Sequence, residues 1–360
     1  MQSSLKQKSY EKPKIYSRKQ EPLYKRVLKG PTYDIYNGRL PTVKEVIYEL
    51  IDAISFWRYK RCLLPFIWFT FHILTGAITV FYVLNYFSIL SFLKIGVAVI
   101  LIGTIFNTVW YHRYVSHKAF KFSHIFWAKL FQFLNPLGLR DETYCIPHYV
   151  HHSIPDQPGD PYGPHLGVLG NYLNVHTTQK YGPSLDEKDF KILCTFVNHI
   201  GIRFNSFNKF KEWGSIEVVS SFLFRTLFTQ SFYLSIFYLF GGLEMVGLFY
   251  SAVFIFSVIM LDFNYRGHGG KMGRPKKKAW DFHESSKARN QLFYGYFASE
   301  WHDNHHNYMR SANSAFLSGQ FDLAFQIIKV MKYLGIVKSF IDKKQAFQDK
   351  YLLDKEAIKS

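Results

Sequence analysis

Two long apolar blocks restrict the fold of this chain more than any other feature. The first runs from about residue 63 to 110 and the second from about 218 to 263. Each block is long enough for two helices of about 20 residues that cross a bilayer. The first block has a turn near residues 85–91, and the second divides at Gly241-Gly242. The sequence therefore predicts four transmembrane helices, over about residues 63–84, 91–110, 218–240 and 244–263.

The charged residues outside the blocks predict how the chain is oriented. The net charge is +18, and lysine and arginine gather over residues 1–42, 111–217 and 264–340, whereas the two turns inside the blocks have almost none. Basic segments stay preferentially on the cytoplasmic side of a membrane. We therefore expect 111–217 and 264–340 to form a helical cytoplasmic cap. The same charge would suit a nucleic-acid partner, but the aromatic content of 19% and the long apolar runs indicate a membrane protein and no nucleic acid.

The N-terminal part of the chain changes character at residue 43. Residues 1–42 are polar and basic, and we expect them to form a mobile arm without a cleaved leader. Over Val43–Ile54, apolar residues recur at helical spacing, opposite polar residues such as Glu49. This pattern predicts an amphipathic helix that lies either on the membrane surface or on the protein's own soluble part. We expect residues 43–360 to form a single domain.

The apolar stretch over residues 120–139 could be mistaken for a fifth span. It is interrupted by Lys121 and Pro136, so we predict an interfacial or re-entrant helix instead. With an even number of spans between them, residues 148–152 and 302–306 lie on the same side of the membrane. The three cysteines have no CxxC spacing and no assigned role.

Histidines recur in two triplets, in one looser pair and once in a pair with an asparagine, outside the apolar blocks. Both triplets have the spacing HxxHH, which places all three imidazoles on one face of a helix. With 15 histidines in 360 residues, one chance HxxHH is expected in only roughly two or three chains per hundred of this composition. Two triplets therefore indicate a metal site. The clusters are His112 and His117; His148, His151 and His152; Asn264 and His268; and His302, His305 and His306.

The number of imidazoles indicates two metal ions, because a single ion takes three or four protein ligands. Zinc would suffice for hydrolysis. A site at the ends of membrane spans faces lipid-soluble substrates, however, and oxidising an unactivated CH₂ group needs a redox metal and dioxygen, which favours iron. His112 and His117 are five residues apart, so they need a helix end or a distortion to share a metal, or they bind different metals. The chain is thus predicted to be an all-α integral membrane protein with four transmembrane helices and a cytoplasmic helical cap that carries a histidine-rich dinuclear metal site.

These clusters resemble the histidine boxes of membrane fatty acid desaturases. The segments His112–His117, His148–His152 and His302–His306 are similar to the three boxes of that family. Asn264–His268 resembles the additional NxxxH element of the stearoyl-CoA (delta-9) branch. The likeness extends over roughly residues 60–340 and includes the order of the spans.

The resemblance implies an enzyme that removes two hydrogens from an acyl chain and leaves a cis double bond at a delta-9-like position, with O₂ as co-substrate. Reduction of O₂ to water needs two further electrons, and the sequence has no haem-binding His-Pro-Gly-Gly segment. The implied donor is therefore a separate ferredoxin or cytochrome b5. The resemblance further implies a multi-pass protein of a bacterial inner membrane or endoplasmic reticulum, in contact with membrane lipid, with its active site on the cytoplasmic face. It implies two Fe²⁺ ions held by His112, His117, His148, His151, His152, His268, His302, His305 and His306, and through water by Asn264.

Two departures from the family pattern bear on the substrate and on the site. Acyl-CoA desaturases usually have Asp-His-Arg in the second box, whereas this chain has Pro147-His148-Tyr149, so an acyl group on CoA, on lipid or on a carrier protein stays open. The family has Glu-Gly-aromatic before the third box, whereas Glu300 here directly precedes Trp301. A fatty acid hydroxylase or related oxidase on the same scaffold is the alternative enzyme, and a non-catalytic metal-binding membrane protein is a third hypothesis.

Overall fold

The computed structural model describes residues 21–33, 39–174, 180–271 and 275–353. The described chain is mostly helical. The α-helices are α1 (Leu23–Arg26), α2 (Val43–Ile54), α3 (Leu63–Tyr86), α4 (Ile89–Ile102), α5 (Ile125–Leu134), α6 (Asp141–Ser153), α7 (Gly167–Asn174), α8 (Glu187–Val197), α9 (Phe207–Trp213), α10 (Val219–Arg266), α11 (Leu292–Phe297), α12 (His302–Asn307), α13 (Leu323–Tyr333) and α14 (Lys344–Gln348). Short 3₁₀-helices are η1 (Lys60–Cys62), η3 (Pro164–Leu166) and η4 (Asn198–Ile200), and π-helices are η2 (Gly103–Ser116) and η5 (Asp349–Leu353).

Two small antiparallel sheets join segments that are distant in sequence. The first pairs β1 (Leu28–Lys29) with β3 (Lys180–Tyr181). The second pairs β2 (Phe120–Phe122) with β4 (Val337–Phe340). The apolar stretch over 120–139 is thus divided between β2 and the ten-residue helix α5, and neither is long enough to cross a bilayer.

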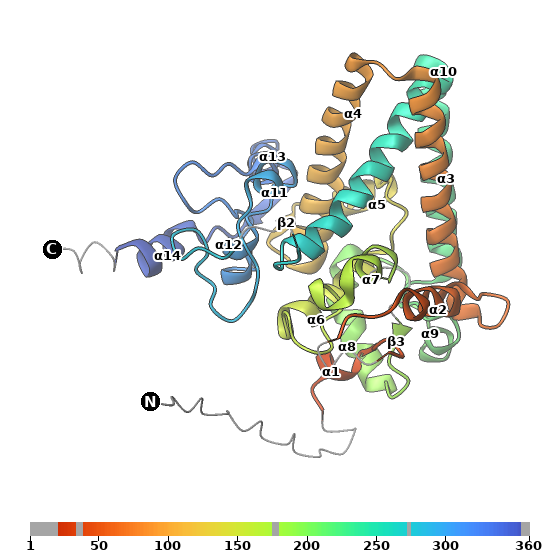
Figure 1. Ribbon diagram of the computed structural model, residues 1–360, viewed down its shortest axis with the longest axis horizontal. Coiled ribbons are helices and arrows are strands. Elements are labelled where there is room, and N and C mark those ends of the chain that lie inside the picture. Colours follow the sequence, from red (N-terminus) through yellow and green to blue (C-terminus); the bar gives the residue numbers. More distant parts are fainter. Residues whose placement is uncertain (1–20, 34–38, 175–179, 272–274, 354–360) are drawn as a thin grey trace, which may run out of the picture.

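Long apolar helices form one end of the molecule. Among the described residues, three helices are long and apolar enough to cross a membrane: Lys60–Tyr86, Ile89–Ser116 and Val219–Arg266. In Figure 1, α3, α4 and α10 stand side by side, and one end of each extends beyond the other helices. Many of their apolar side chains are exposed, among them Leu84 at 78% and Leu239 at 81%. A surface of this kind is suited to contact with lipid.

The longest helix, α10, contains a sharp kink. Gly241 and Gly242 have non-helical backbone angles, and Gly242 has a φ of +61°, a conformation that glycine adopts without steric cost. The kink coincides with the division that the sequence predicts in the second apolar block.

Helix α2 has the predicted bounds, but its apolar residues serve two surfaces. Thr42 caps its first turn, and its side chain accepts a hydrogen bond from the backbone N–H of Glu45. Val46 is buried against the protein, whereas Val43 is 66% exposed. Glu49, which the pattern places opposite the apolar residues, is buried as well, and its carboxylate accepts a hydrogen bond from the backbone N–H of Thr32 at 2.6 Å.

The described part of the predicted mobile arm is packed rather than free. Val27 is fully buried, and β1 pairs with β3. The guanidinium of Arg26 donates to Asp189 on α8, with 2.6 Å between Nη2 and Oδ1. These contacts fasten residues 21–33 to the helices around α8. Residues 1–20 and 34–38 of the predicted arm lie outside the described residues.

Candidate metal centre

Nine histidines from four segments meet where the long helices join the rest of the molecule. The end of η2 supplies the first two histidines, and α6 supplies three. The segment directly after α10 supplies one, and α12 supplies three. They form two groups in which the candidate ligand atoms all lie within 4.8 Å of one another. The first group is His112, His117, His148, His152 and His305, and the second group is His151, His268, His302 and His306.

Each HxxHH triplet contributes to both groups. On α6, His148 and His152 belong to the first group, whereas His151 belongs to the second. The triplet on α12 divides as well, since His305 joins the first group while its two partners join the second. Residues i, i+3 and i+4 lie on one helix face but at slightly different angles. The two triplets therefore lie between the groups and supply imidazoles to either side.

The five-residue spacing of His112 and His117 is accommodated by a π-helix. The backbone N–H of His117 donates to the carbonyl of His112 at 3.1 Å, the i→i+5 bond of a wider turn. Residues five apart return to the same face in such a turn, and the two ring centroids are 4.8 Å apart. Of the options that the spacing leaves open, the structure shows a helix distortion with both rings in one group.

The imidazoles point their Nε2 atoms at one another. The distance between Nε2 atoms is 2.7 Å for His117 and His148, and 3.1 Å for His112 and His305 in the first group. In the second group it is 2.7 Å between His268 and His302. A cation about 2 Å from each nitrogen would separate neighbouring ligand nitrogens by roughly 3 Å. The donor set therefore fits two metal ions bound through Nε2.

The electrostatic environment keeps these imidazoles in the form that binds metal. Burial, and then repulsion from neighbouring imidazoles, lowers the pKa of His148, His152 and His305 well below its ordinary value. The same causes, in the same order, lower the pKa of His302 and His306. Neutral imidazole is the metal-binding form.

Two carboxylates orient histidines of the second group from behind. Asp160 contacts Nδ1 of His151 at 2.9 Å, and Asp156 contacts Nδ1 of His268 at 3.0 Å. Metal-bound imidazoles typically donate their other N–H to such a group. Burial opposes ionisation of Asp156, but the hydrogen bond with His268, the charge of that imidazole and the hydrogen bond from the backbone of Lys287 together outweigh it and lower the pKa to about 2. Asp156 has a positive φ of 61° in the loop after α6, and only its position four residues before Asp160 could have suggested this role from sequence.

Two other carboxylates near the boxes have different partners. Asp262 accepts hydrogen bonds from the hydroxyl of Tyr172 and from Arg266, both at 2.7 Å. Asp303 accepts from the backbone N–H of Phe282 at 2.6 Å. Both carboxylates therefore hold the surrounding chain rather than an imidazole.

Glu300 lies between the two groups. Its Oε2 is 3.4 Å from Nδ1 of His112, and its Oε1 is 3.8 Å from Nδ1 of both His302 and His305. Oε1 and the Nδ1 of His302 are buried without a hydrogen-bond partner. Burial raises the pKa of the Glu300 carboxyl to about 8, against the attraction of Arg113. Positive charge held by the histidines would favour its ionised form.

A narrow cavity of about 60 Å³ borders both histidine groups. Its lining is largely apolar and aromatic, and Asn264 lies in it together with members of both groups. His72 of α3 also borders the cavity, although its position inside an apolar span gave no sign of this. An apolar cavity beside a cluster of imidazoles suits a hydrocarbon substrate. The apolar lining includes Leu137, Leu139, Phe256, Met260, Leu261 and Phe263.

No family model matches the chain. It is 22% identical to the delta-9 acyl-lipid desaturase 1 of Arabidopsis thaliana over 254 residues, which cover 68% of this chain and 73% of that protein. It is 26% identical to the acyl-CoA 5-desaturase AL21 of Anemone leveillei, over 65% of this chain and 66% of that protein. A palmitoyl-monogalactosyldiacylglycerol delta-7 desaturase of A. thaliana is 23% identical over 66% of this chain and 58% of its own. These relatives support membership of the membrane fatty acid desaturase family.

Both departures from the desaturase pattern have structural counterparts. Tyr149, at the position of the usual arginine, packs its ring on Phe196 of α8, with centroids 4.8 Å apart. The glutamate that directly precedes Trp301 lies beside imidazoles of both histidine groups. The chain thus lacks a cation in the segment His148–His152 but has a carboxylate within its histidine cluster.

Proposed function

We propose that the chain is a fatty acyl desaturase that removes two hydrogens from adjacent carbons of an acyl chain and leaves a cis double bond. The observation that carries this proposal is the pair of buried imidazole groups that border one apolar cavity. We propose a delta-9-like bond position, which is the position in the names of several relatives. O₂ would be the co-substrate.

Two iron ions would occupy the centre, one in each histidine group. Asn264, which lines the cavity, would complete the second group through water. When bound, the metal pair supplies the redox chemistry that C–H oxidation by O₂ requires. The residues of the chain bind and orient the reacting groups. Carboxylates behind the imidazoles orient them, and the apolar lining binds the acyl chain and excludes water from the carbons that react.

The membrane arrangement follows from the same placement. We propose four spans in a single domain over residues 43–360, with the kink of α10 as the turn between the last two. Residues 111–217 and 264–340 would form the cytoplasmic cap. The predicted parity of the spans agrees with the convergence of all four histidine clusters, because clusters on opposite sides of a bilayer could not meet.

A second cavity supports a phosphate-bearing head group on the acyl substrate. It has a volume of about 250 Å³ and lies at the foot of α3. Arg61, Arg140, Lys180 and Lys211 line it. Arg140 pairs with Glu142, and Lys180 pairs with a carboxylate of α2. The other two cations form no ion pair with the described residues, which leaves them available for an anion. Leu139, the neighbour of Arg140, lines the first cavity. The electron donor would be a separate ferredoxin or cytochrome b5.

Fatty acid analysis tests this proposal against its alternatives. The protein is expressed with an active reductant, and the membrane fatty acids are analysed by mass spectrometry. New monounsaturated acids support desaturation and report the bond position, whereas hydroxy acids would identify a hydroxylase. An unchanged profile would contradict both enzymes and leave a non-catalytic metal protein. His305→Ala should abolish product. The matched control is His124→Ala, which alters a histidine outside the two groups and should leave product formation unchanged.

A further inference from the structure

We propose that Glu300 is a positioning residue shared by both metal sites, so that one carboxylate orients imidazoles of each histidine group. The inference rests on the proposed function, because it assigns the carboxylate a task toward the metal ligands. Its basis is geometric. One carboxylate lies 3.4 Å from Nδ1 of His112 in the first group and 3.8 Å from Nδ1 of His302 in the second. Nδ1 of His305, in the first group, is also 3.8 Å away.

The other carboxylates behind the centre serve a single imidazole each. Asp160 contacts His151, and Asp156 contacts His268, and both of these histidines belong to the second group. In the described part of the chain, no carboxylate except that of Glu300 lies within 4.0 Å of a histidine nitrogen of the first group. Orientation of the first group therefore depends on Glu300 more than orientation of the second group does.

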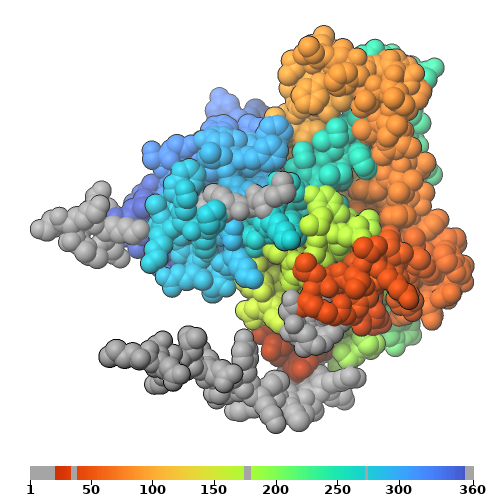
Figure 2. Space-filling view, in the orientation of Figure 1, coloured from red at the N-terminus to blue at the C-terminus, as the bar shows by residue number. Residues whose placement is uncertain are grey.

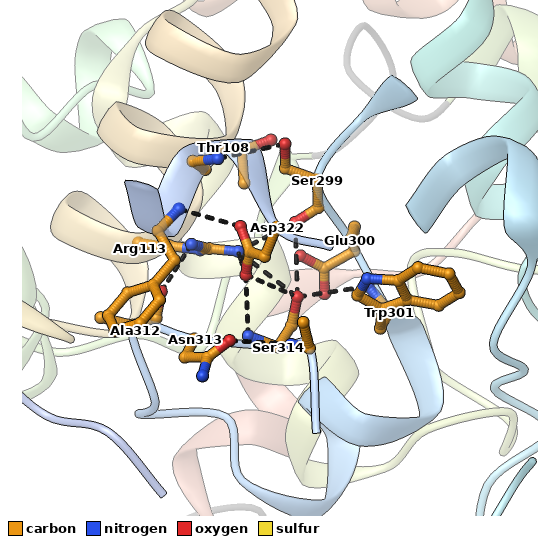
Figure 3. A network of polar contacts seen from close by, with 12 residues as sticks. Thr108, Arg113, Ser299, Glu300, Trp301, Ala312, Asn313, Ser314 and Asp322 are labelled. Atoms are coloured by element: carbon orange, nitrogen blue, oxygen red, sulfur yellow. Dashed lines mark hydrogen bonds and ion pairs between the residues drawn. The ribbon is translucent and has the colours of Figure 1, made fainter. Parts of the chain in front are cut away.

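The backbone on both sides of Glu300 is held by a buried polar network, shown in Figure 3. Ser299 has a positive φ of 54°, and its carbonyl accepts a hydrogen bond from Arg113 at 2.9 Å. The backbone N–H of Trp301 donates to the hydroxyl of Ser314 at 3.3 Å. Ser314 also donates its backbone N–H to Asp322 at 2.8 Å. The carboxylate is thus attached to a segment that is fixed before and after it.

The same network joins Glu300 to the first histidine cluster. Arg113, the neighbour of His112, forms a fully buried ion pair with Asp322 at 2.7 Å. Its other terminal nitrogen donates to the carbonyl of Ala312 at 2.5 Å. One guanidinium therefore sets the position of the η2 terminus relative to the segment that carries Glu300. This arrangement explains how Glu300 is held beside His112, although the two residues are 188 positions apart in sequence.

A carboxylate that faces three Nδ1 atoms favours the tautomer in which Nδ1 carries the proton and Nε2 is free to bind metal. Loss of such a partner typically lowers metal affinity by about 10- to 100-fold. Because Glu300 faces both groups, its loss should weaken both metal sites together. Loss of Asp160, which faces one group, should weaken one site.

Metal titration of the purified full-length protein tests this difference. Metal-free wild type, Glu300→Gln, Asp160→Asn and Asp262→Asn are titrated with Co²⁺ in detergent without oxygen, and the d–d absorption and bound metal per chain are measured. We expect two Co²⁺ ions in the wild type, both bound at least about tenfold more weakly in E300Q. D160N should weaken one ion, and D262N, whose carboxylate touches no imidazole, should weaken neither.

Two outcomes would overturn the inference: E300Q with both ions at wild-type affinity, or E300Q with only one ion weakened. Glu300→Asp keeps the charge on a shorter side chain and should bind both ions with intermediate affinity, which a folding defect would not produce. Circular dichroism and thermal unfolding of each metal-free variant check the fold. A wild-type protein that binds no Co²⁺ would contradict the proposed function itself. That result is distinct from failure of this inference alone, in which the wild type binds Co²⁺ and the variants do not differ as expected.

Discussion

At the scale of single residues, the ion pair between Arg113 and Asp322 joins the end of η2 to the segments that follow the third histidine box. Both side chains are almost completely buried, and each has further hydrogen bonds. Removing one member of a buried pair leaves the other charge without compensation.

Asp322→Asn should therefore destabilise the protein by about 3–5 kcal/mol. Thermal unfolding in detergent, followed by circular dichroism, measures the loss. Lys191→Gln removes an exposed pair with Glu187 and should change the unfolding temperature little, which makes it the matched control. An unchanged unfolding temperature for the Asp322 variant would show that the buried pair does not hold these segments together.

The basic cavity at the foot of α3 allows a prediction about substrate binding. Replacing Arg61 and Lys211 with glutamine removes two cations without breaking an ion pair of the described residues. Each charge near an anionic group contributes about 1 kcal/mol, which is roughly a fivefold change in affinity. The double variant should raise the apparent KM more than tenfold and leave kcat nearly unchanged. Steady-state kinetics with a phosphate-bearing acyl substrate measure both quantities, and Lys209→Gln, which lies outside the cavity, is the control. An unchanged KM would argue against a head-group site here.

Among the secondary-structure elements, the packed N-terminal segment should respond to pH. The hydrogen bond from Arg26 is the main cause that lowers the pKa of Asp189 in the folded protein. Because the folded pKa is depressed, the stabilisation is present above the unfolded pKa, near 4, and is lost as pH falls below it. Protection of residues 21–33 from hydrogen exchange, expressed relative to the intrinsic exchange rate at each pH, should therefore fall on acidification from pH 5 to pH 3. In Arg26→Gln, this protection should already be low at pH 5, and β4 serves as an internal reference. Equal protection in both proteins would rule out this attachment.

At the scale of elements, local patterns in the sequence predict well where helices lie in the chain. They predict poorly which elements those helices pack against. The bounds of α2 and the division of the second apolar block follow from spacing and from Gly241-Gly242, which are local features. Burial of Glu49 depends on Thr32, and on α13 Phe325 is buried whereas Val330 is exposed, although both side chains are apolar. Both of these outcomes depend on which elements pack nearby, and a periodic pattern contains no such information.

The same contrast holds for the candidate site. HxxHH spacing identifies which histidines can share a helix face, and the structure brings all nine together. The spacing cannot tell which group each imidazole joins, since this depends on the relative placement of α6 and α12. The spacing of His112 and His117 showed that a distortion was one of the options, but the π-helix that provides it is not visible in the sequence. Asp156 shares its loop with Asp160, and their spacing of four residues does not show which imidazole each carboxylate contacts.

For the whole molecule, the arrangement in the membrane makes a testable prediction. The space-filling view in Figure 2 shows the helices of the first apolar block rising from the rest of the molecule. If four spans are present, the turn after α3 and the kink of α10 face away from the cytoplasm. Single cysteines at Phe87 and Leu243, which are 61% and 56% exposed, should react with an impermeant maleimide added from outside. A cysteine at Ser184 should react only after the membrane is permeabilised, and the unsubstituted protein sets the background.

Labelling of position 243 on the same side of the membrane as position 184 would remove one of the predicted crossings. Labelling of position 184 from outside intact cells would invert the orientation, and with it the expected access of a cytoplasmic electron donor. Span number is thus decided by comparing the two positions, and orientation by position 184.

The division of each HxxHH triplet between the two groups has a consequence for biosynthesis. The first group includes His305, and the second includes His268, His302 and His306, so both depend on residues that are translated after α10. A ribosome-bound chain that has just released α6 displays five of the nine imidazoles but can complete neither pocket. Metal insertion must then follow synthesis of α12, after the apolar blocks have been translated. Cells starved of the metal should accumulate a full-length, membrane-inserted precursor that can be loaded later without new protein synthesis.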